Sequence, residues 1–369
     1  MQNAQTYRAA IVGCSRIGAF IDNEVVGRPD VVLPYSHAAG YEACGRTDLV
    51  AGADLRPEVL VAFGERYGVG PEHRYTDYRE MIETERPDIV SVTTPSLARA
   101  EPVIFAAEHG VRGIYAEKGL SASLEEADRM VAALRANGTA FNWGAMRRHH
   151  DGYRQLRAAI AGGEIGAPRQ ATMAFFTDLI THHPHTLDTV AMLLGDPEPL
   201  WVEGRLVEPG DPEAQGLRRP LPAYDAAGRR FVPAAGEVYA SPYPAFFRVR
   251  YAGGPEAGFL PYGRFDTDVI GTEGRALSWD NGQLFRTRRS ARGGAPAREQ
   301  TYTPRGESPT VCTIRDIIRE LETGERTAGN IDVTMRSVEV QFGIIASHQR
   351  GGERVALPIA DRTVYVPGR

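Results

Sequence analysis

The sequence predicts two domains of different fold class, an α/β domain with a doubly wound parallel sheet followed by an α+β domain. In the first half of the chain, short apolar runs alternate with helical patterns, which is typical of parallel strands connected by helices. In the second half, strand patterns cluster and two long helical patterns follow them, which is typical of an α+β domain. The chain has 369 residues, 42% of them hydrophobic, so it is long enough to bury two cores.

Four apolar runs in the first half are predicted to be buried parallel strands: residues 8–13, 49–54, 88–94 and 113–117. The clearest helical pattern spans residues 123–138, where Ser123 and Glu126 form a capping box and Gly138 can end the helix. The apolar side chains of this helix share one face: Leu124, Ala127, Met130, Val131 and Leu134.

Three segments of the second half read as strands: residues 201–208, 246–251 and 275–280. The segment FFRVRY at 246–251 alternates apolar and charged residues, as expected for a strand with one face in water. Two helical patterns follow, at residues 311–324 and 333–348.

Composition excludes several classes of partner. The net charge of −5 and the pI near 6.0 give no electrostatic reason to expect a nucleic acid or an anionic membrane surface. The start MQNAQTYRAA lacks the features of a secretory signal, and no apolar run approaches transmembrane length. Cys14, Cys44 and Cys312 form neither a disulfide framework nor a metal pattern. A cytoplasmic protein is expected.

The turn GCSRIG, residues 13–18, follows the first predicted strand. Gly13 permits a tight turn, Gly18 permits close packing of the next helix on the strand, and Ser15 stands where a second glycine is usual. Asp54 ends the second predicted strand, where an acid can accept hydrogen bonds from both hydroxyls of an adenosine ribose. An ordinary surface aspartate is the alternative. The order of strand, turn, helix, strand and acid predicts dinucleotide binding, with Arg16 and Ile17 completing the turn.

The choice of cofactor depends on two neighbouring residues of opposite charge. Asp54 disfavours a 2′-phosphate, whereas Arg56 could pair with one. NAD is therefore predicted, with NADP possible.

Further segments resemble the glucose-fructose oxidoreductase / inositol dehydrogenase / rhizopine catabolism (Gfo/Idh/MocA) family. The first turn is similar to that family's dinucleotide turn, TDYREMIETERPDIVSVTTP to its Thr-Pro turn, and IYAEKGLSASLEEADRMV to its Glu-Lys-Pro strand end. GAMRRHHDGYRQLRAAIAGGEIG resembles the linker to its second domain, and HTLDTVAMLLGD its His-x-x-Asp helix start. VIGTEG and GGERVALPIADR fit the same family.

The resemblance implies a Rossmann domain over residues 1–142 and an α+β domain over residues 143–369, built on an open, mostly antiparallel sheet that also makes a homodimer or homotetramer contact. It implies NAD(P)-dependent hydride transfer between nicotinamide and a hydroxyl-bearing carbon of a sugar, polyol or sugar acid. It places Thr94, Pro95, Glu117 and Lys118 at the cofactor. The alternatives are an enzyme that retains NAD for transient oxidation, as in glycoside cleavage or epimerisation, and a non-catalytic NAD-binding regulator.

Lys118 is the predicted catalytic base. Oxidation of an alcohol requires a group that removes the hydroxyl proton while the hydride goes to the cofactor. Lys118 ends a predicted parallel strand, on the side of the sheet where ligands bind. Partial desolvation beside a positive nicotinamide would favour the neutral amine.

The segment THHPHTLD, residues 181–188, supplies the other predicted catalytic residue. By resemblance, His185 relays the proton or contacts the substrate hydroxyl; a helix-start histidine bonded to backbone is the alternative. His182 and His183 are expected to shape the substrate pocket. A zinc site on His183 and His185 lacks an identifiable third ligand, so no metal is predicted. Asp188 either binds a substrate hydroxyl or complements the positive end of its helix.

The sequence departs from the family pattern in three places. Gly119 replaces the proline after the lysine, and Arg99 replaces a histidine after the Thr-Pro turn. Thr181 stands four residues before His185, where an aspartate is common, and Asp178 is a possible substitute. Thr181 is still expected at the substrate. If Arg147 points inward, an acidic substrate such as a uronate becomes plausible.

Overall fold

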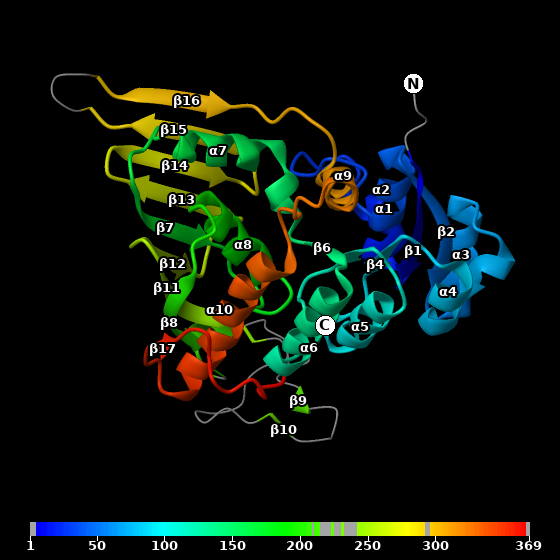
Figure 1. Ribbon diagram of the computed structural model, residues 1–369. Coiled ribbons are helices and arrows are strands. Elements are labelled where there is room, and N and C mark those ends of the chain that lie inside the picture. Colours follow the sequence, from blue (N-terminus) through cyan, green and yellow to red (C-terminus); the bar gives the residue numbers. More distant parts are fainter. Residues whose placement is uncertain are drawn as a thin grey trace. The chain divides into compact units, whose positions relative to one another are not determined.

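The computed structural model describes residues 5–208, 210–214, 223–224, 230–231, 242–291 and 296–366 (Figure 1). Contacts divide the chain into two compact units. The first holds residues 1–121, 126–149 and 307–331, and the second holds residues 122–125, 150–306 and 332–369. The sequence predicts one division, after residue 142. In the structure, residues 143–149 and the later segment 307–331 also pack with the first unit.

The first unit contains a parallel sheet with the strand order β3-β2-β1-β4-β5-β6. Because the order runs outward from β1 in both directions, the sheet is doubly wound, and the predicted α/β class is confirmed. Two strands were not predicted: β3 is only two residues long, and β6 carries a polar Asn142 in its middle. The strands are β1 (Tyr7–Val12), β2 (Thr47–Ala53), β3 (Arg74–Tyr75), β4 (Ile89–Val92), β5 (Gly113–Ala116) and β6 (Ala140–Trp143).

Helices cover both faces of this sheet (Figure 1). Side chains of α2, α3 and α9 share one buried cluster with Tyr7, Ala9 and Ile11 of β1. Figure 1 shows α5 and α6 on the side of the sheet away from α9. The helix predicted at 123–138 is confirmed as α6. The helices are α1 (Asp22–Val25), α2 (His37–Cys44), α3 (Pro57–Tyr67), α4 (Tyr78–Glu85), α5 (Ala100–Glu108), α6 (Leu124–Asn137) and α9 (Pro309–Thr323).

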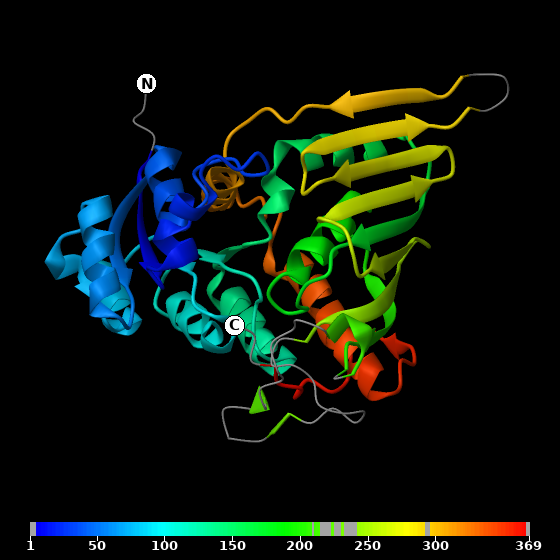
Figure 2. The ribbon, with the colours of Figure 1, turned by 180° about the vertical axis from the view of Figure 1, so that it is seen from behind.

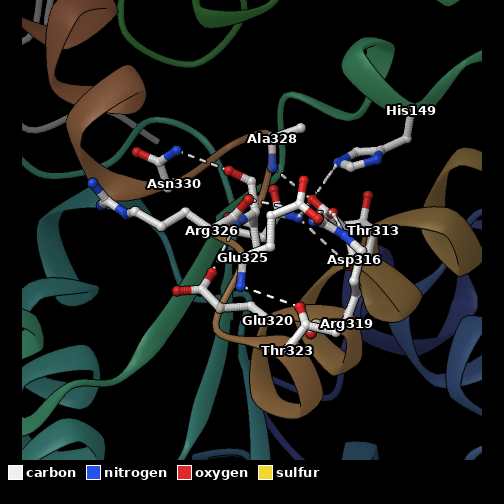
Figure 3. Close-up of polar contacts among 12 residues, drawn as sticks. His149, Thr313, Asp316, Arg319, Glu320, Thr323, Glu325, Arg326, Ala328 and Asn330 are labelled. Atoms are coloured by element: carbon white, nitrogen blue, oxygen red, sulfur yellow. Dashed lines mark hydrogen bonds and ion pairs between the residues drawn. The ribbon is translucent and has the colours of Figure 1, made fainter.

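A polar cluster holds α9 and the residues after it against β6 (Figure 3). One oxygen of the Asp316 carboxylate accepts hydrogen bonds from the backbone N–H of Ala328 at 2.7 Å and from the Asn142 amide at 3.0 Å. Its other oxygen accepts from Arg319 at 2.5 Å. The backbone N–H of Trp143 also donates to the carbonyl of Gly329, at 3.1 Å. These bonds explain why residues 307–331 pack with the parallel sheet.

The second unit contains a nine-stranded sheet with the order β16-β15-β14-β13-β7-β12-β11-β8-β17 (Figures 1 and 2). All neighbouring pairs are antiparallel except β7 with β12, which confirms the predicted α+β class. The strands are β7 (Pro168–Ala174), β8 (Pro199–Leu206), β11 (Pro244–Tyr251), β12 (Glu256–Leu260), β13 (Asp266–Gly271), β14 (Gly274–Trp279), β15 (Leu284–Arg289), β16 (Arg298–Tyr302) and β17 (Val355–Ala356). A separate pair joins β9 (Ala223–Tyr224) to β10 (Arg230–Phe231).

Three helices accompany this sheet: α7 (Asp151–Ala161), α8 (His183–Leu193) and α10 (Ile331–Gln349). The alternation seen in FFRVRY is confirmed on β11, where Phe247, Val249 and Tyr251 are buried while Arg248 is half-buried. Every residue of α8 is buried, so the sequence that follows THH is held inside the second unit. Within the described ranges, no helix is both long and apolar enough to cross a membrane.

Candidate active site

The turn after β1 has the close approach that its two glycines predict. Gly13 has φ +96°, a left-handed conformation that favours glycine. A Cβ atom on Gly18 would lie 2.1 Å from the carbonyl oxygen of Gly13, so only glycine fits there. The Thr93 hydroxyl donates to the same oxygen at 2.5 Å and ties the end of β4 to the turn. The backbone is therefore shaped as a dinucleotide requires.

The other residues of the turn lie on a short π-helical segment, Arg16–Phe20. Ser15 precedes this segment, and its side chain makes no capping hydrogen bond. Arg16 is exposed and pairs with Glu24 at 2.8 Å. The Arg16 side chain is therefore paired with Glu24, and Arg16 contributes its backbone to the turn.

Asp54 lies directly after β2, and its carboxylate is only 7% exposed. It accepts hydrogen bonds from the backbone N–H of Arg56 at 3.1 Å and from the Arg56 guanidinium at 3.2 Å. The acid predicted to bind a ribose and the cation that could accept a 2′-phosphate thus form an ion pair. A ligand at this position meets both groups together.

Arg99 joins the ends of β4 and β5 from a fully buried position. Its guanidinium donates to the carbonyl oxygens of Thr94 and Gly119, one from each strand end. Burial lowers the pKa of Arg99 to about 10, although Glu117 opposes this shift. Replacement of the family histidine by Arg99 therefore has a structural role, because one side chain holds the loops that carry Thr94, Pro95 and Gly119.

Glu117 ends β5 and is buried, with 3% of its side chain exposed. Burial raises its pKa, but Lys118, His37 and Arg99 outweigh burial and hold the pKa at about 2. The carboxylate accepts from the backbone N–H of Lys118 at 3.1 Å, and the Lys118 Nζ atom lies 3.8 Å away. His37 Nε2 lies 3.3 Å from the other oxygen. An ionised, buried carboxylate therefore accompanies the predicted base.

Lys118 is the only lysine in the chain; every other residue of the 42 counted as Lys or Arg is an arginine. Its side chain is 23% exposed, so it is partly desolvated but reachable. Arginine cannot release its proton at ordinary pH, whereas lysine can. The presence of a single lysine can be read from the sequence alone. It favours a role for Lys118 in proton transfer, which a guanidinium would not fulfil.

Arg147 lies on the turn Met146–His149, close to the same strand end. Its positive charge acts on the phenol of Tyr35, and the negative charge of Glu117 acts on the same phenol. Burial is the largest influence and raises the Tyr35 pKa. Tyr35 comes from the segment inserted after the first turn, and it was not predicted as a site residue.

The second unit holds the histidine segment, where the carboxylate of Asp178 organises the start of α8. Asp178 accepts from the Thr181 hydroxyl at 2.5 Å, from the Thr181 backbone N–H at 2.7 Å and from His182 Nδ1. Burial raises the pKa of Asp178, but the bonds from His182 and Thr181 outweigh it and lower the pKa far below its usual value. The aspartate–histidine pair of this segment is therefore Asp178 with His182, and Thr181 supports it.

His183 does not shape a pocket, and that expectation is wrong. Its ring is fully buried against the edges of Phe247 and Phe259, and Nδ1 pairs with the Thr186 hydroxyl at 2.8 Å. Burial lowers the pKa of His183 to about 3, so the ring stays neutral. His183 is a core histidine with a local hydrogen bond.

His185 and Asp188 both lie on α8 and are 8% and 1% exposed. The ring of His185 lies edge-on to Phe265, with 6.2 Å between the centroids. The first turn of α8 contains no acidic residue. Asp188 therefore does not complement the positive end of the helix. Its charge instead acts on the buried phenol of Tyr251.

In the part of the chain that the structure describes, no group of three or more His, Cys, Asp or Glu side chains could hold a metal ion. That a metal plays no part stays a prediction from the sequence.

Comparison with known proteins identifies the first unit. Residues 7–144 match the family model GFO_IDH_MocA, described as an oxidoreductase family with an NAD-binding Rossmann fold. The match covers the segment that holds the parallel sheet and ends before residues 150–306 of the second unit. The first turn, the Thr-Pro turn and the Glu-Lys strand end noted in the sequence lie within these residues, which supports the resemblance over this part of the chain.

Two curated relatives share part of their length with the chain. Inositol 2-dehydrogenase of Salmonella typhimurium strain LT2 is 29% identical over 164 residues, 44% of this chain and 44% of the relative. The 2,7-anhydro-N-acetylneuraminate hydratase of Mediterraneibacter gnavus is 30% identical over 148 residues, 35% of this chain and 39% of the relative. The match thus spans less than half of each relative, and the two relatives are named for different reactions.

A solved structure extends the comparison of fold to both units of the chain. Aldose–aldose oxidoreductase from Caulobacter crescentus, in complex with glycerol, has a TM-score of 0.72 at 19% identity. The alignment covers 96% of this chain and 100% of that one. The fold of both units, the nine-stranded sheet included, is therefore one already seen in a solved structure.

Proposed function

We propose that the protein is an NAD-dependent oxidoreductase that transfers a hydride between nicotinamide and a hydroxyl-bearing carbon of a sugar, polyol or sugar acid. The observation that carries the proposal is Lys118. The only lysine of the chain stands at the carboxyl end of β5, beside an ionised carboxylate, in a domain of an NAD-binding oxidoreductase family. A base that must gain and lose a proton explains why lysine and not arginine occupies this position.

The residues present fit a dinucleotide. The turn from Gly13 to Gly18 leaves no space for a side chain at either glycine, and its backbone would hold the pyrophosphate. Asp54 would accept hydrogen bonds from the adenosine ribose, and Thr94 and Pro95 would border the nicotinamide ribose. When bound, NAD supplies the hydride acceptor. Lys118 takes the proton of the substrate hydroxyl at Nζ, and Glu117 provides the opposite charge.

Asp54 tests cofactor binding directly. We expect Asp54→Ala to weaken NAD binding by about 1–3 kcal/mol, because charge-assisted bonds to the ribose hydroxyls are lost. NADP should lose less affinity than NAD, since Arg56 is released from its partner. Calorimetry with both cofactors measures this. Asp48→Ala, at the exposed start of β2, is the matched control and should not change either affinity. Equal affinity of the parent and Asp54→Ala for NAD would reject the assignment.

A screen of polyols, aldoses and uronates with NAD and NADP tests the activity, with reduced cofactor as the signal. Arg147 supports the inclusion of acidic sugars, because it lies on the turn after β6, close to the Lys118 edge. No reduced cofactor with any of these compounds, in protein that binds NAD, would reject a simple dehydrogenase.

The second proton-transfer group is best sought in THHPHTLD. We propose that His182, paired with Asp178, exchanges the proton with solvent, because its side chain is 51% exposed and has an anionic partner. His185 has the family position and stays the competing candidate. His182→Gln should lower turnover by about 10²-fold and alter the rate–pH profile, and His185→Gln should have a smaller effect. If only His185→Gln lowers turnover and alters that profile, the family position holds the relay.

A specific comparison favours a second function. One relative is named a hydratase, and a hydration has no net change of oxidation state. A reaction without net oxidation fits an enzyme in which retained NAD oxidises the substrate only transiently. In that case a substrate would be consumed without net accumulation of reduced cofactor, which product analysis by mass spectrometry would detect. A non-catalytic regulator would bind NAD and consume nothing, and the unique lysine argues against it.

We also propose a homodimer or homotetramer formed through the nine-stranded sheet, a cytoplasmic location, and no nucleic-acid partner. Trp201 lies on β8. The guanidinium groups of Arg248, on β11, and of Arg354, directly before β17, lie over its ring at 5.5 and 4.1 Å from the centroid. Aromatic and arginine side chains are enriched at protein interfaces, which supports this sheet as the contact. Sedimentation velocity would give the size of the oligomer and would contradict the proposal if it showed a monomer at micromolar concentration.

A further inference from the structure

A chain of buried polar groups runs from the middle of the parallel sheet to Lys118. The Tyr41 hydroxyl shares a hydrogen bond with the Ser91 hydroxyl at 2.8 Å, and Ser91 shares another with His37 Nδ1 at 2.8 Å. His37 Nε2 reaches Glu117 at 3.3 Å, and Glu117 lies 3.8 Å from the Lys118 amine. Tyr41, Ser91 and His37 are fully buried. Three parts of the first unit contribute to the chain: α2, β4 and the two residues that follow β5.

Stability alone does not explain this arrangement. A buried charge requires partners, and buried ionic groups can often be replaced by apolar residues without loss of stability. Here the ring of His37 stacks on Tyr115 with 3.9 Å between centroids, so an apolar side chain would also pack there. The polar chain is more simply explained by what it does to the carboxylate at its end.

The groups described below that face Glu117 in the first unit are neutral or positively charged. Glu117 therefore supplies the negative charge beside Lys118. Burial raises the pKa values of Tyr35 and Tyr115, so both phenols are neutral near pH 7. Arg99 and Arg147 are cations and disfavour a further positive charge nearby. Because Glu117 is ionised, it can only accept the hydrogen bond from His37, so the Nε2 atom of His37 carries the proton.

We propose that His37 is a positioning residue that acts on Lys118 through Glu117. The imidazole holds the Glu117 carboxylate in place, and this carboxylate supplies the opposite charge 3.8 Å from the Lys118 amine. The consequence for turnover rests on the proposed function. The effect on Lys118 itself does not.

The single lysine makes the test direct. Protein grown with lysine labelled with carbon-13 at Cε gives one lysine Cε signal in an NMR spectrum, and its chemical shift reports protonation of the amine. Glu117→Gln should move the midpoint of this titration to lower pH by at least about one unit, because the ammonium loses its opposite charge.

Two substitutions of His37 distinguish the hydrogen bond made by Nε2 from the one made by Nδ1. In His37→Gln the side-chain amide reaches as far as Nε2 and can still donate to Glu117. In His37→Asn the shorter amide matches Nδ1, so it keeps the bond to Ser91 and loses the bond to Glu117. We expect His37→Asn to shift the Lys118 midpoint in the same direction as Glu117→Gln, and His37→Gln to restore it. Glu101→Gln, on the surface of α5, is the control and should leave the midpoint unchanged.

The proposal is overturned if either Glu117→Gln or His37→Asn, shown to be folded by its amide spectrum, keeps the parental midpoint. If His37→Asn does not fold, His37→Ala, which also removes the donor to Glu117, replaces it in this comparison. A midpoint that shifts equally in His37→Gln and Glu117→Gln overturns it.

Kinetics form a second, independent arm once a substrate is known. Alcohol oxidation needs the neutral amine, so kcat/KM rises with pH through the Lys118 transition. Glu117→Gln and His37→Asn should move this rise to lower pH. NMR shifts without oxidation of any sugar or polyol would reject the proposed function and leave the role of His37 standing. Oxidation of a sugar or polyol together with an unchanged Lys118 titration would support the proposed function and reject the role of His37.

Discussion

Lys118→Arg is expected to lower turnover by about 10²–10⁴-fold, the range attributed to loss of a general acid–base group. The substitution keeps a positive charge beside Glu117, so the buried carboxylate still has a cationic partner. What it removes is the ability to accept a proton, because a guanidinium stays charged near neutral pH. Affinity for NAD should change little. Steady-state kinetics and calorimetry measure the two quantities separately.

Arg129→Lys is the matched control for this experiment. Arg129 is exposed on α6 and pairs with Glu101, and the exchange introduces a lysine where no chemistry is proposed. Turnover should be unchanged. If Lys118→Arg retained the parental kcat, Lys118 would be a structural cation, and the proposal that it takes the hydroxyl proton would be wrong.

Arg99→Met is expected to lower the free energy of unfolding by about 2–4 kcal/mol. The variant leaves the carbonyl oxygens of Thr94 and Gly119 without their charged donor, and it removes one of the cations that keep Glu117 ionised. Because the loops that carry Thr94 and Gly119 lose their shared anchor, and Thr94 is proposed to border the nicotinamide ribose, NAD affinity should fall as well. Chemical denaturation with and without NAD measures both effects.

Arg129→Met, which breaks an exposed ion pair, should change the free energy of unfolding by less than about 0.5 kcal/mol. The comparison separates the loss of any arginine from the loss of this buried one. Unchanged stability of Arg99→Met would mean that solvent replaces its donors, and Arg99 would then not be the link between the two loops.

The sequence by itself determined the fold class, and it predicted most of the residues proposed to bind the cofactor. Apolar runs with helices between them specify a parallel sheet, because only that arrangement buries strands on both faces. Gly13 and Asp54 follow a strand directly and Lys118 lies two residues after one, so local order along the chain already places them at one edge of the sheet. The weakest strands escaped prediction, since β3 is two residues long and pairs through its backbone.

Tertiary structure alone decided which polar groups meet. Asp178 and His182 are four residues apart in the segment before α8. Only the folded structure shows that the Asp178 carboxylate pairs with His182. His37 and Glu117 are 80 residues apart, and nothing in their sequence spacing indicates a contact. Arg99 becomes a link between two loops only once β4 and β5 lie side by side. The spacing of apolar residues along the sequence indicates which residues are buried, because burial repeats along a helix or strand. Hydrogen-bond partners depend on distances between segments that the chain brings together only when it folds.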